Sequence, residues 1–323
     1  MDQSNQRSAN GSLVEEVLKP ILYADIFDYP LTFDEIYKFL EFKTTPDEVQ
    51  SLLDRAIENR EIIFIDQFYS LADKPHLVAK RRERWLASQE LWPKAISYGR
   101  WVASLPFIRM VSVTGSLAVD NPRDGVDDID FLIVTRPGRL WLCRALIILL
   151  VRWGRLRGVH LCPNYLLTEN VLYFDDNNLF VAREMLQMIP LYGREFYLKM
   201  REINSWLTNY LPQGYGLNLE KVSEQLSPVQ NLLKKMGEFL LAGLIGDSIE
   251  KTLQKIQITK HTRQAAKSGA LDKVVFTADM CKGHYNSHNQ RTMSAYHQRL
   301  QAHVINGKLP PLNGRLGEIG SRE

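Results

Sequence analysis

The spacing of apolar residues predicts that the chain begins with helices. Residues 1–12 are polar and are predicted to be disordered. Over residues 13–25 apolar side chains recur every three or four positions, which predicts a helix that Pro20 kinks or divides. Thr32, with a glutamate three positions later, is typical of a capping box and predicts a second helix over 32–42.

A third helix and a hairpin complete this first region. Pro46 occupies a first helical position and predicts a helix over 45–58. Two short runs of β-branched and aromatic residues, 62–65 and 68–71, then predict a hairpin. Three helices followed by a hairpin resemble a winged helix-turn-helix, so residues 13–75 are predicted to form a winged-helix-like domain.

The charge of the third helix bears on whether this domain binds DNA. Lys and Arg supply most of the affinity for a duplex because they neutralise phosphates. The helix and the residues after it carry five acids and two bases, a net charge of −3: Asp47, Glu48, Asp54, Glu58 and Glu61 against Arg55 and Arg60. Electrostatics therefore argue against DNA binding and favour a packing or protein-contact role.

A change of period marks the middle of the chain. Residues 76–105 keep helical spacing and are predicted to form a linker helix, whereas β-branched residues alternate after them. One such run ends at Gly115 and Ser116, and thirteen residues after the glycine Asp128 and Asp130 open a second run. Alternation along a strand places both aspartates on one face, where they repel each other unless a cation neutralises them. Mg²⁺ accepts one or two carboxylates together with substrate phosphates, so the pattern predicts a magnesium site.

The Gly-Ser turn supplies the other half of a phosphate site, because glycine lets the backbone approach closely and serine adds a hydroxyl and an N–H donor. Gly-Ser, about a dozen residues, then Asp-x-Asp in an apolar strand resembles the signature of the DNA polymerase β-like nucleotidyltransferase superfamily, over about 109–176. The resemblance implies a nucleotidyltransferase core, predicted at 106–177. The resemblance further implies that Gly115 and Ser116 bind the nucleotide and that Asp128 and Asp130 hold one or two Mg²⁺ ions. The alternative is a hairpin whose loop happens to be acidic.

The next predicted strand departs from the superfamily pattern. Residues 159–168 contain a proline that indicates an edge strand or a bulge. The superfamily commonly carries a third carboxylate on this strand, which helps to hold metal and activates the attacking hydroxyl. Asn164 stands there instead and cannot act as a carboxylate base. Glu169, just beyond, is the nearest acid: it is the third catalytic candidate beside Asp128 and Asp130, or otherwise a charge at the strand end.

Helical spacing returns in the last part of the chain. Residues 178–305 are predicted to form a C-terminal helical domain, including a helix of about twenty-five residues from Ser227 with its leucines on one face. Residues 251–303 contain nine Lys or Arg and two acids, which indicates either a contact with a triphosphate or polyanionic acceptor, or a solvated basic surface. Residues 306–323 are predicted to be a flexible tail.

Composition narrows the class of protein. The chain has 323 residues, of which 45% are hydrophobic and 24% charged, as in soluble globular proteins of two or three domains. A net charge of +3 does not by itself indicate nucleic acid, and three irregularly spaced cysteines indicate a reducing compartment. The N-terminus has no apolar core, and the most apolar stretch, 140–153, is too short to span a bilayer. We therefore expect a cytoplasmic protein without a membrane partner.

These patterns predict an α+β protein in which a small mixed-sheet nucleotidyltransferase domain is flanked by a winged-helix-like domain and a helical domain. The predicted reaction moves a nucleoside monophosphate from a nucleoside triphosphate, such as ATP, to an acceptor hydroxyl and releases pyrophosphate. Two alternative functions remain. Asn164 is compatible with a catalytically lapsed nucleotide-binding or regulatory protein, and the winged-helix-like domain is compatible with a DNA-binding regulator. Neither the acceptor nor the preferred base leaves a pattern in the sequence.

Overall fold

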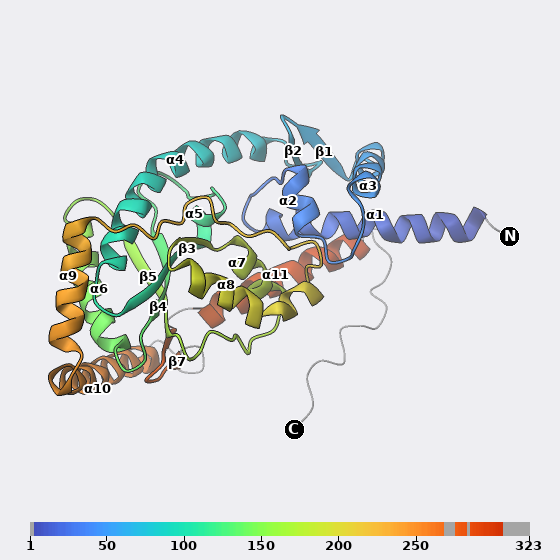
Figure 1. Cartoon of the computed structure of the whole chain (residues 1–323). Helices are drawn as coiled ribbons and strands as arrows, with labels where there is room; N and C mark the ends of the chain where they lie inside the picture. Colours follow the sequence, from blue (N-terminus) through green and yellow to red (C-terminus); the bar gives the residue numbers. More distant parts are fainter. Residues whose placement is uncertain (1–2, 268–274, 283–284, 306–323) are drawn as a thin grey trace, which may run out of the picture. The chain divides into compact units, whose positions relative to one another are not determined.

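A computed structural model of the chain describes residues 3–267, 275–282 and 285–305 and confirms an α+β fold (Figure 1). The chain divides into two compact units. Unit 1 combines Met1–Arg81 with Tyr210–Tyr215 and Gln290–Glu323, and unit 2 combines Arg82–Asn209 with Gly216–Asn289. Helices α4 (His76–Ala103) and α11 (Tyr285–Ile305) contribute to both units. The predicted tail, 306–323, lies outside the described residues.

Unit 1 contains the predicted helices and hairpin. Its elements are α1 (Gln3–Asp25), α2 (Phe33–Lys38), α3 (Pro46–Glu58), β1 (Ile62–Ile65) and β2 (Phe68–Leu71). The capping box at Thr32 is confirmed, and Thr45 forms a second one at the start of α3. Strands β1 and β2 are antiparallel, and Asp66 and Gln67 between them both have positive φ angles, 52° and 69°. Two such residues are typical of the tight turn whose twist matches the strands of a hairpin.

Helix α1 differs from its prediction in two ways. It begins at Gln3, so most of the segment predicted to be disordered is helical, and it runs past Pro20 without a division. Extending an existing helix adds one hydrogen bond per residue and needs no new nucleus, which lets a polar segment continue it. Val17, Leu18 and Ile21 are almost completely buried on both sides of the proline, so packing holds the two halves in one helix.

Unit 2 is built on a six-stranded mixed sheet in the order β6-β3-β4-β5-β8-β7. Strand β3 is antiparallel to β4, as the central hairpin predicts, and β4 is parallel to β5. Residues of β3, β4 and β5 pack on one face of the sheet against α4 and α6, in the core that contains Leu91, Trp92 and Trp141. The other face turns toward α7 and α8. The strands and helices are β3 (Ile108–Thr114), α5 (Gly115–Ala118), β4 (Ile129–Thr135), α6 (Leu140–Arg155), β5 (Leu161–Thr168), α7 (Leu179–Gln187), β6 (Ile189–Tyr192), α8 (Arg194–Ile203), a 3₁₀ turn (Ser205–Asn209), α9 (Pro228–Leu241), α10 (Leu244–Lys267), β7 (Val275–Phe276) and β8 (Met280–Lys282).

The structure corrects the predicted domain boundaries. Strand β6 pairs with β3, and β8 pairs with β5, so the region predicted as a helical domain completes the central sheet. Both strands are too short for alternation to be readable, and Pro190 in β6 is tolerated because that strand lies at the sheet edge. Helix α4 is not a free linker, because Leu91, Trp92 and Ala95 are buried in the core of unit 2.

Two further predictions are resolved within unit 2. Strand β5 lies in the middle of the sheet, so its proline marks an irregularity and not an edge: the register shifts between Asp130 and Leu132 of β4. The single long helix expected from Ser227 is two helices, α9 and α10, separated by Ala242 and Gly243. In the described part of the chain, no helix combines the length and the apolar character that crossing a membrane requires.

Candidate functional site

The Gly-Ser turn and one of the predicted aspartates meet at one end of the sheet. Thr114, the last residue of β3, is the register partner of Asp130 in β4, and the chain turns into α5 at Gly115. Gly115 has a φ angle of +67°, which favours glycine. A Cβ atom at this position would overlap Oδ2 of Asp130 and lie 3.2 Å from its Cγ. Only glycine therefore leaves room for this carboxylate against the turn.

Asp127 holds the loop between the turn and β4. The hydroxyl of Ser116 donates to Oδ2 of Asp127 over 3.5 Å, and the backbone N–H of Arg123 donates to the same oxygen over 2.9 Å. The guanidinium of Arg123 donates to Oδ1 over 3.2 Å. Burial raises the pKa of Asp127, but the hydrogen bonds from Arg123 and the backbone of Asp128, together with the Arg123 charge, outweigh burial and leave the pKa below its usual value. Asp127 therefore fixes the Ser116 side chain at the turn through this hydrogen bond, a role that the sequence pattern did not reveal.

The two predicted aspartates are close enough to repel each other and differ in exposure. Asp128 directly precedes β4, and its side chain is 64% exposed. Asp130 lies inside β4, where burial raises its pKa to about 6, with a further contribution from the charges of Asp128 and Asp127. A cation would offset the repulsion between this half-buried carboxylate and its neighbour, so the pair fits Mg²⁺ by charge and by ligand type.

The described residues hold no cluster of three or more His, Cys, Asp or Glu side chains arranged for a metal ion. Two carboxylates are nevertheless sufficient for Mg²⁺, which commonly keeps several waters and takes its other ligands from substrate phosphates. Asp128 and Asp130 are the residues that would hold it.

Two side chains that the sequence analysis missed accompany the aspartates. Strand β5 runs parallel to β4, and the N–H of Ile129 donates to the carbonyl of His160 over 2.8 Å. This pairing leaves Nδ1 of His160 3.8 Å from Oδ1 of Asp128. It also sets Cys162 opposite Asp130, and the two side chains form a hydrogen bond. Burial and the adjacent Asp130 raise the pKa of Cys162, so the group beside Asp130 is a thiol that donates.

The third predicted catalytic residue, Glu169, does not join the aspartates. It follows the far end of β5, where its N–H donates to the carbonyl of Thr135 over 3.0 Å. Its carboxylate lies 3.8 Å from Nε of Arg109. Strand β5 has eight residues, and a strand rises about 3.3 Å per residue, so Glu169 lies roughly 20 Å along the sheet from the position beside Asp130. Asn164 is half-buried at the irregularity in β5.

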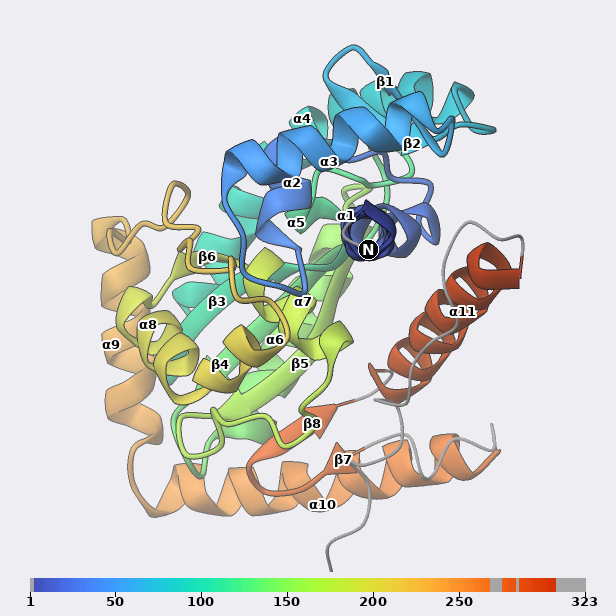
Figure 2. The same cartoon turned by 90° about the vertical axis from the view of Figure 1, so that its right-hand side faces the viewer.

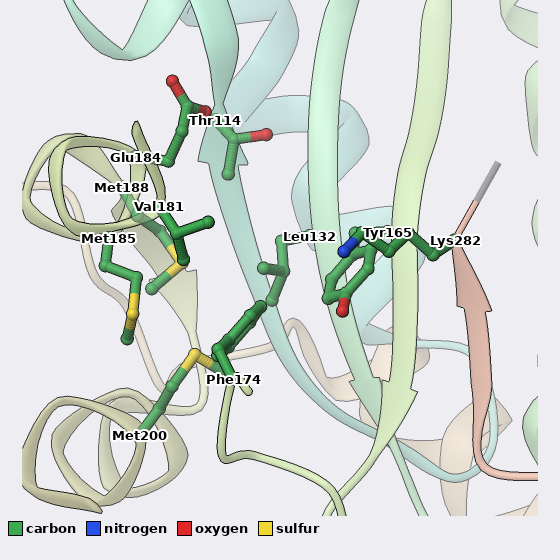
Figure 3. A pocket seen from close by; sticks show the side chains of 10 residues that line it. All are labelled: Thr114, Leu132, Tyr165, Phe174, Val181, Glu184, Met185, Met188, Met200 and Lys282. Carbon is green, nitrogen blue, oxygen red and sulfur yellow. The ribbon is translucent and has the colours of Figure 1, made fainter. Parts of the chain in front are cut away.

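A small cavity continues the aspartate face of the sheet beneath α7 and α8 (Figure 3). It has room for about one water molecule, 30 Å³, and is mainly apolar, with Met185, Met188 and Met200 on its helical side. Thr114 lines its upper part and is 3% exposed, yet its hydroxyl has no hydrogen-bond partner among the described residues. A buried hydroxyl without a partner, directly before Gly115, fits a ligand that carries acceptor oxygens.

Comparisons of the chain with protein-family models, with curated proteins and with solved structures gave no match.

The raised pKa of Asp130 predicts that Asp130→Asn stabilises the protein when divalent cations are absent. The folded-state pKa, about 6, lies above the ordinary value of 3.8, so the charged carboxylate destabilises the fold above pH 6. This penalty fades as the pH falls from 6 to 3.8. A shift of this size corresponds to a gain of up to about 3 kcal/mol in unfolding free energy at neutral pH, and to only about 0.5 kcal/mol at pH 4. Urea unfolding in EDTA at both pH values measures it, and an equal gain at the two values would contradict the assignment.

Proposed function

We propose that unit 2 is a metal-dependent nucleotidyltransferase that transfers a nucleoside monophosphate from a nucleoside triphosphate to an acceptor hydroxyl. The observation that carries the proposal is the contact of Gly115 with Asp130, which unites the two halves of the predicted motif. A hairpin with an incidentally acidic loop gives no reason for a glycine whose missing side chain leaves room for a half-buried carboxylate. The antiparallel β3–β4 pair followed by a parallel β5 also agrees with the mixed sheet that the superfamily resemblance implies.

Different residues of the site would bind the metal, bind the phosphates and accept the proton of the acceptor hydroxyl. Asp128 and Asp130 would hold one or two Mg²⁺ ions, which supply the positive charge that stabilises the entering and leaving oxygens. The backbone at Gly115 and the hydroxyl of Ser116 would donate to the pyrophosphate oxygens, and the hydroxyl of Thr114 has a free donor for the same purpose. His160, beside the exposed Asp128, offers a ring nitrogen that can accept the proton of the acceptor hydroxyl.

A second candidate function follows from the group opposite Asp130. The superfamily resemblance leads one to expect a carboxylate on the third strand, but the register partner of Asp130 is Cys162, a neutral donor. A site with two carboxylates and no third can bind a nucleotide with Mg²⁺ and turn it over slowly or not at all. This reading describes a lapsed nucleotide-binding or regulatory protein, and it uses the same residues.

Titration with each of the four nucleoside triphosphates, with and without Mg²⁺, separates these functions when binding and pyrophosphate release are scored together. A transferase shows binding that depends on Mg²⁺ and releases pyrophosphate once an acceptor hydroxyl is supplied, with water as the default acceptor. Binding that depends on Mg²⁺ without release under any condition supports the lapsed site. Absence of binding for all four triphosphates would overturn both functions.

A further inference from the structure

Helix α9 packs against the rest of unit 2 with its polar face, and its apolar face points outward. On the inner face Lys234 is buried, and its ammonium group donates to the carbonyls of Ala103 over 2.9 Å and Ile108 over 2.8 Å. One turn further on, the carboxylate of Glu238 accepts the backbone N–H of Phe107. The outward side chains are Val229, Leu232, Leu233, Met236, Phe239 and Leu240. A surface helix normally has the opposite arrangement, which makes this face a candidate contact surface.

The outward apolar face continues around the corner between α9 and α10. The two most exposed apolar side chains of these helices lie there: Phe239 is 84% exposed and Leu244 87%, and the neighbouring Leu240 and Ile245 are exposed as well. We call these four residues the α9–α10 corner. Figures 1 and 2 show α9 and α10 meeting at the border of unit 2, where no other element of the unit lies over the corner. Soluble proteins rarely expose a contiguous apolar patch of this kind unless it binds a partner or a membrane.

The exposed charges of the helices that form and adjoin the corner are mainly positive. Helix α10 packs against both α6 and α9, and the three helices together carry eight exposed bases: Arg152, Arg155, Lys235, Lys251, Lys255, Lys260, Arg263 and Lys267. The same helices contain three acids, and each is engaged within the unit. Glu238 binds Phe107, Asp247 pairs with Arg139 over 2.6 Å, and Glu250 accepts the N–H groups of Trp141 and Leu142 at the start of α6. Among the described residues of these three helices, each acid therefore has a partner within the unit, and the exposed bases outnumber the acids.

We propose that this surface binds an anionic lipid bilayer, with the α9–α10 corner among the upper acyl chains and the bases against the headgroups. Exposed Leu, Ile and Phe beside Lys and Arg are the combination that lies in a membrane interface, and anionic headgroups attract each base near the surface. If a second copy of the chain bound through the same surface, the lysines and arginines of the two copies would face and repel each other. A nucleic acid would neutralise the lysine and arginine side chains but would leave Phe239 and Leu244 exposed to water. The contact is peripheral and requires no spanning helix, but it departs from the expectation that the protein has no membrane partner.

Flotation of the full chain with vesicles tests the proposal. We expect binding to phosphatidylcholine vesicles that contain about one third phosphatidylserine, at least tenfold weaker binding to pure phosphatidylcholine, and loss of binding in high salt. The double variant Phe239→Ser with Leu244→Ser should bind about tenfold more weakly, because its apolar contact is gone. Lys255→Glu with Lys260→Glu should weaken binding as strongly through charge alone. Leu86→Ser is the matched control: this leucine of α4 is 60% exposed and lies outside the surface, so binding should not change.

The variants alter exposed side chains, so the fold should persist, and thermal unfolding monitored by circular dichroism checks it. The proposal is overturned if the wild-type chain binds neither kind of vesicle, or if the serine double variant binds as well as the wild type. It is also overturned if sedimentation shows a dimer that the serine double variant converts to monomers, since a second copy would then cover the corner. The proposal is likewise overturned if duplex or single-stranded nucleic acid binds while anionic vesicles do not, because the exposed lysines and arginines would then form a nucleic-acid site.

Discussion

Asp128→Asn is expected to abolish Mg²⁺-dependent pyrophosphate release and to leave the fold intact. The substitution removes one of the two carboxylates that would hold the metal, and metal stabilisation of the entering and leaving oxygens contributes several kcal/mol. We therefore expect a rate at least about a thousandfold lower, since each factor of ten corresponds to about 1.4 kcal/mol. The Asp128 side chain is 64% exposed and only precedes β4, so thermal stability should not fall. Pyrophosphate release at saturating triphosphate and Mg²⁺ measures the effect.

Glu169→Gln provides the matched control, because the same change of carboxylate to amide is made at the opposite end of the sheet. The sequence makes Glu169 a catalytic candidate, whereas the structure pairs it with Arg109. Release should then stay within about twofold of the wild-type rate, as for a surface substitution. If Asp128→Asn kept full activity, or if Glu169→Gln lost as much as Asp128→Asn, the proposed metal site would be wrong.

Local signals in the sequence were sufficient to predict the helices that begin at a capping residue. Thr32 and Thr45 each carry a glutamate three positions later, and the structure starts a helix after each of them. The central hairpin follows from alternation alone. The short strands β6 and β8 were missed because three or four residues contain no readable period, and they form only because β3 and β5 offer free edges.

The candidate site could be predicted only where its residues are close in sequence. Gly115 directly follows β3 and Asp130 lies in the next strand, β4, which pairs with β3, so their contact follows from the motif. His160 and Cys162 come to the aspartates through the parallel pairing of β4 and β5, before the register shifts between Asp130 and Leu132. No local pattern encodes such a register, and choosing the nearest acid in sequence therefore led to Glu169. The outward face of α9 shows the same limit: its period was predicted correctly, but periodicity does not say which face meets the core.

The second large effect is expected for Gly115→Ala, measured against Gly138→Ala. Both glycines have positive φ angles, +67° and +70°, so each substitution costs about 1–2 kcal/mol of stability through backbone strain. A Cβ atom at Gly138 meets nothing within 4 Å, whereas at Gly115 it overlaps the Asp130 carboxylate. That carboxylate can rotate away at little further cost in stability, but the rotation removes it from the metal position.

We therefore expect the two alanine variants to unfold at similar denaturant concentrations and to differ in function. In Gly115→Ala, Mg²⁺-dependent triphosphate binding and pyrophosphate release should fall about a hundredfold, the loss expected when a reacting group is misplaced by about 1 Å. In Gly138→Ala both should match the wild type. Calorimetric titration of the triphosphate with Mg²⁺ measures binding directly, and it remains informative if the site proves to be lapsed. If both variants lost function equally, the strain itself would be the cause and the contact of Gly115 with Asp130 would have no functional role.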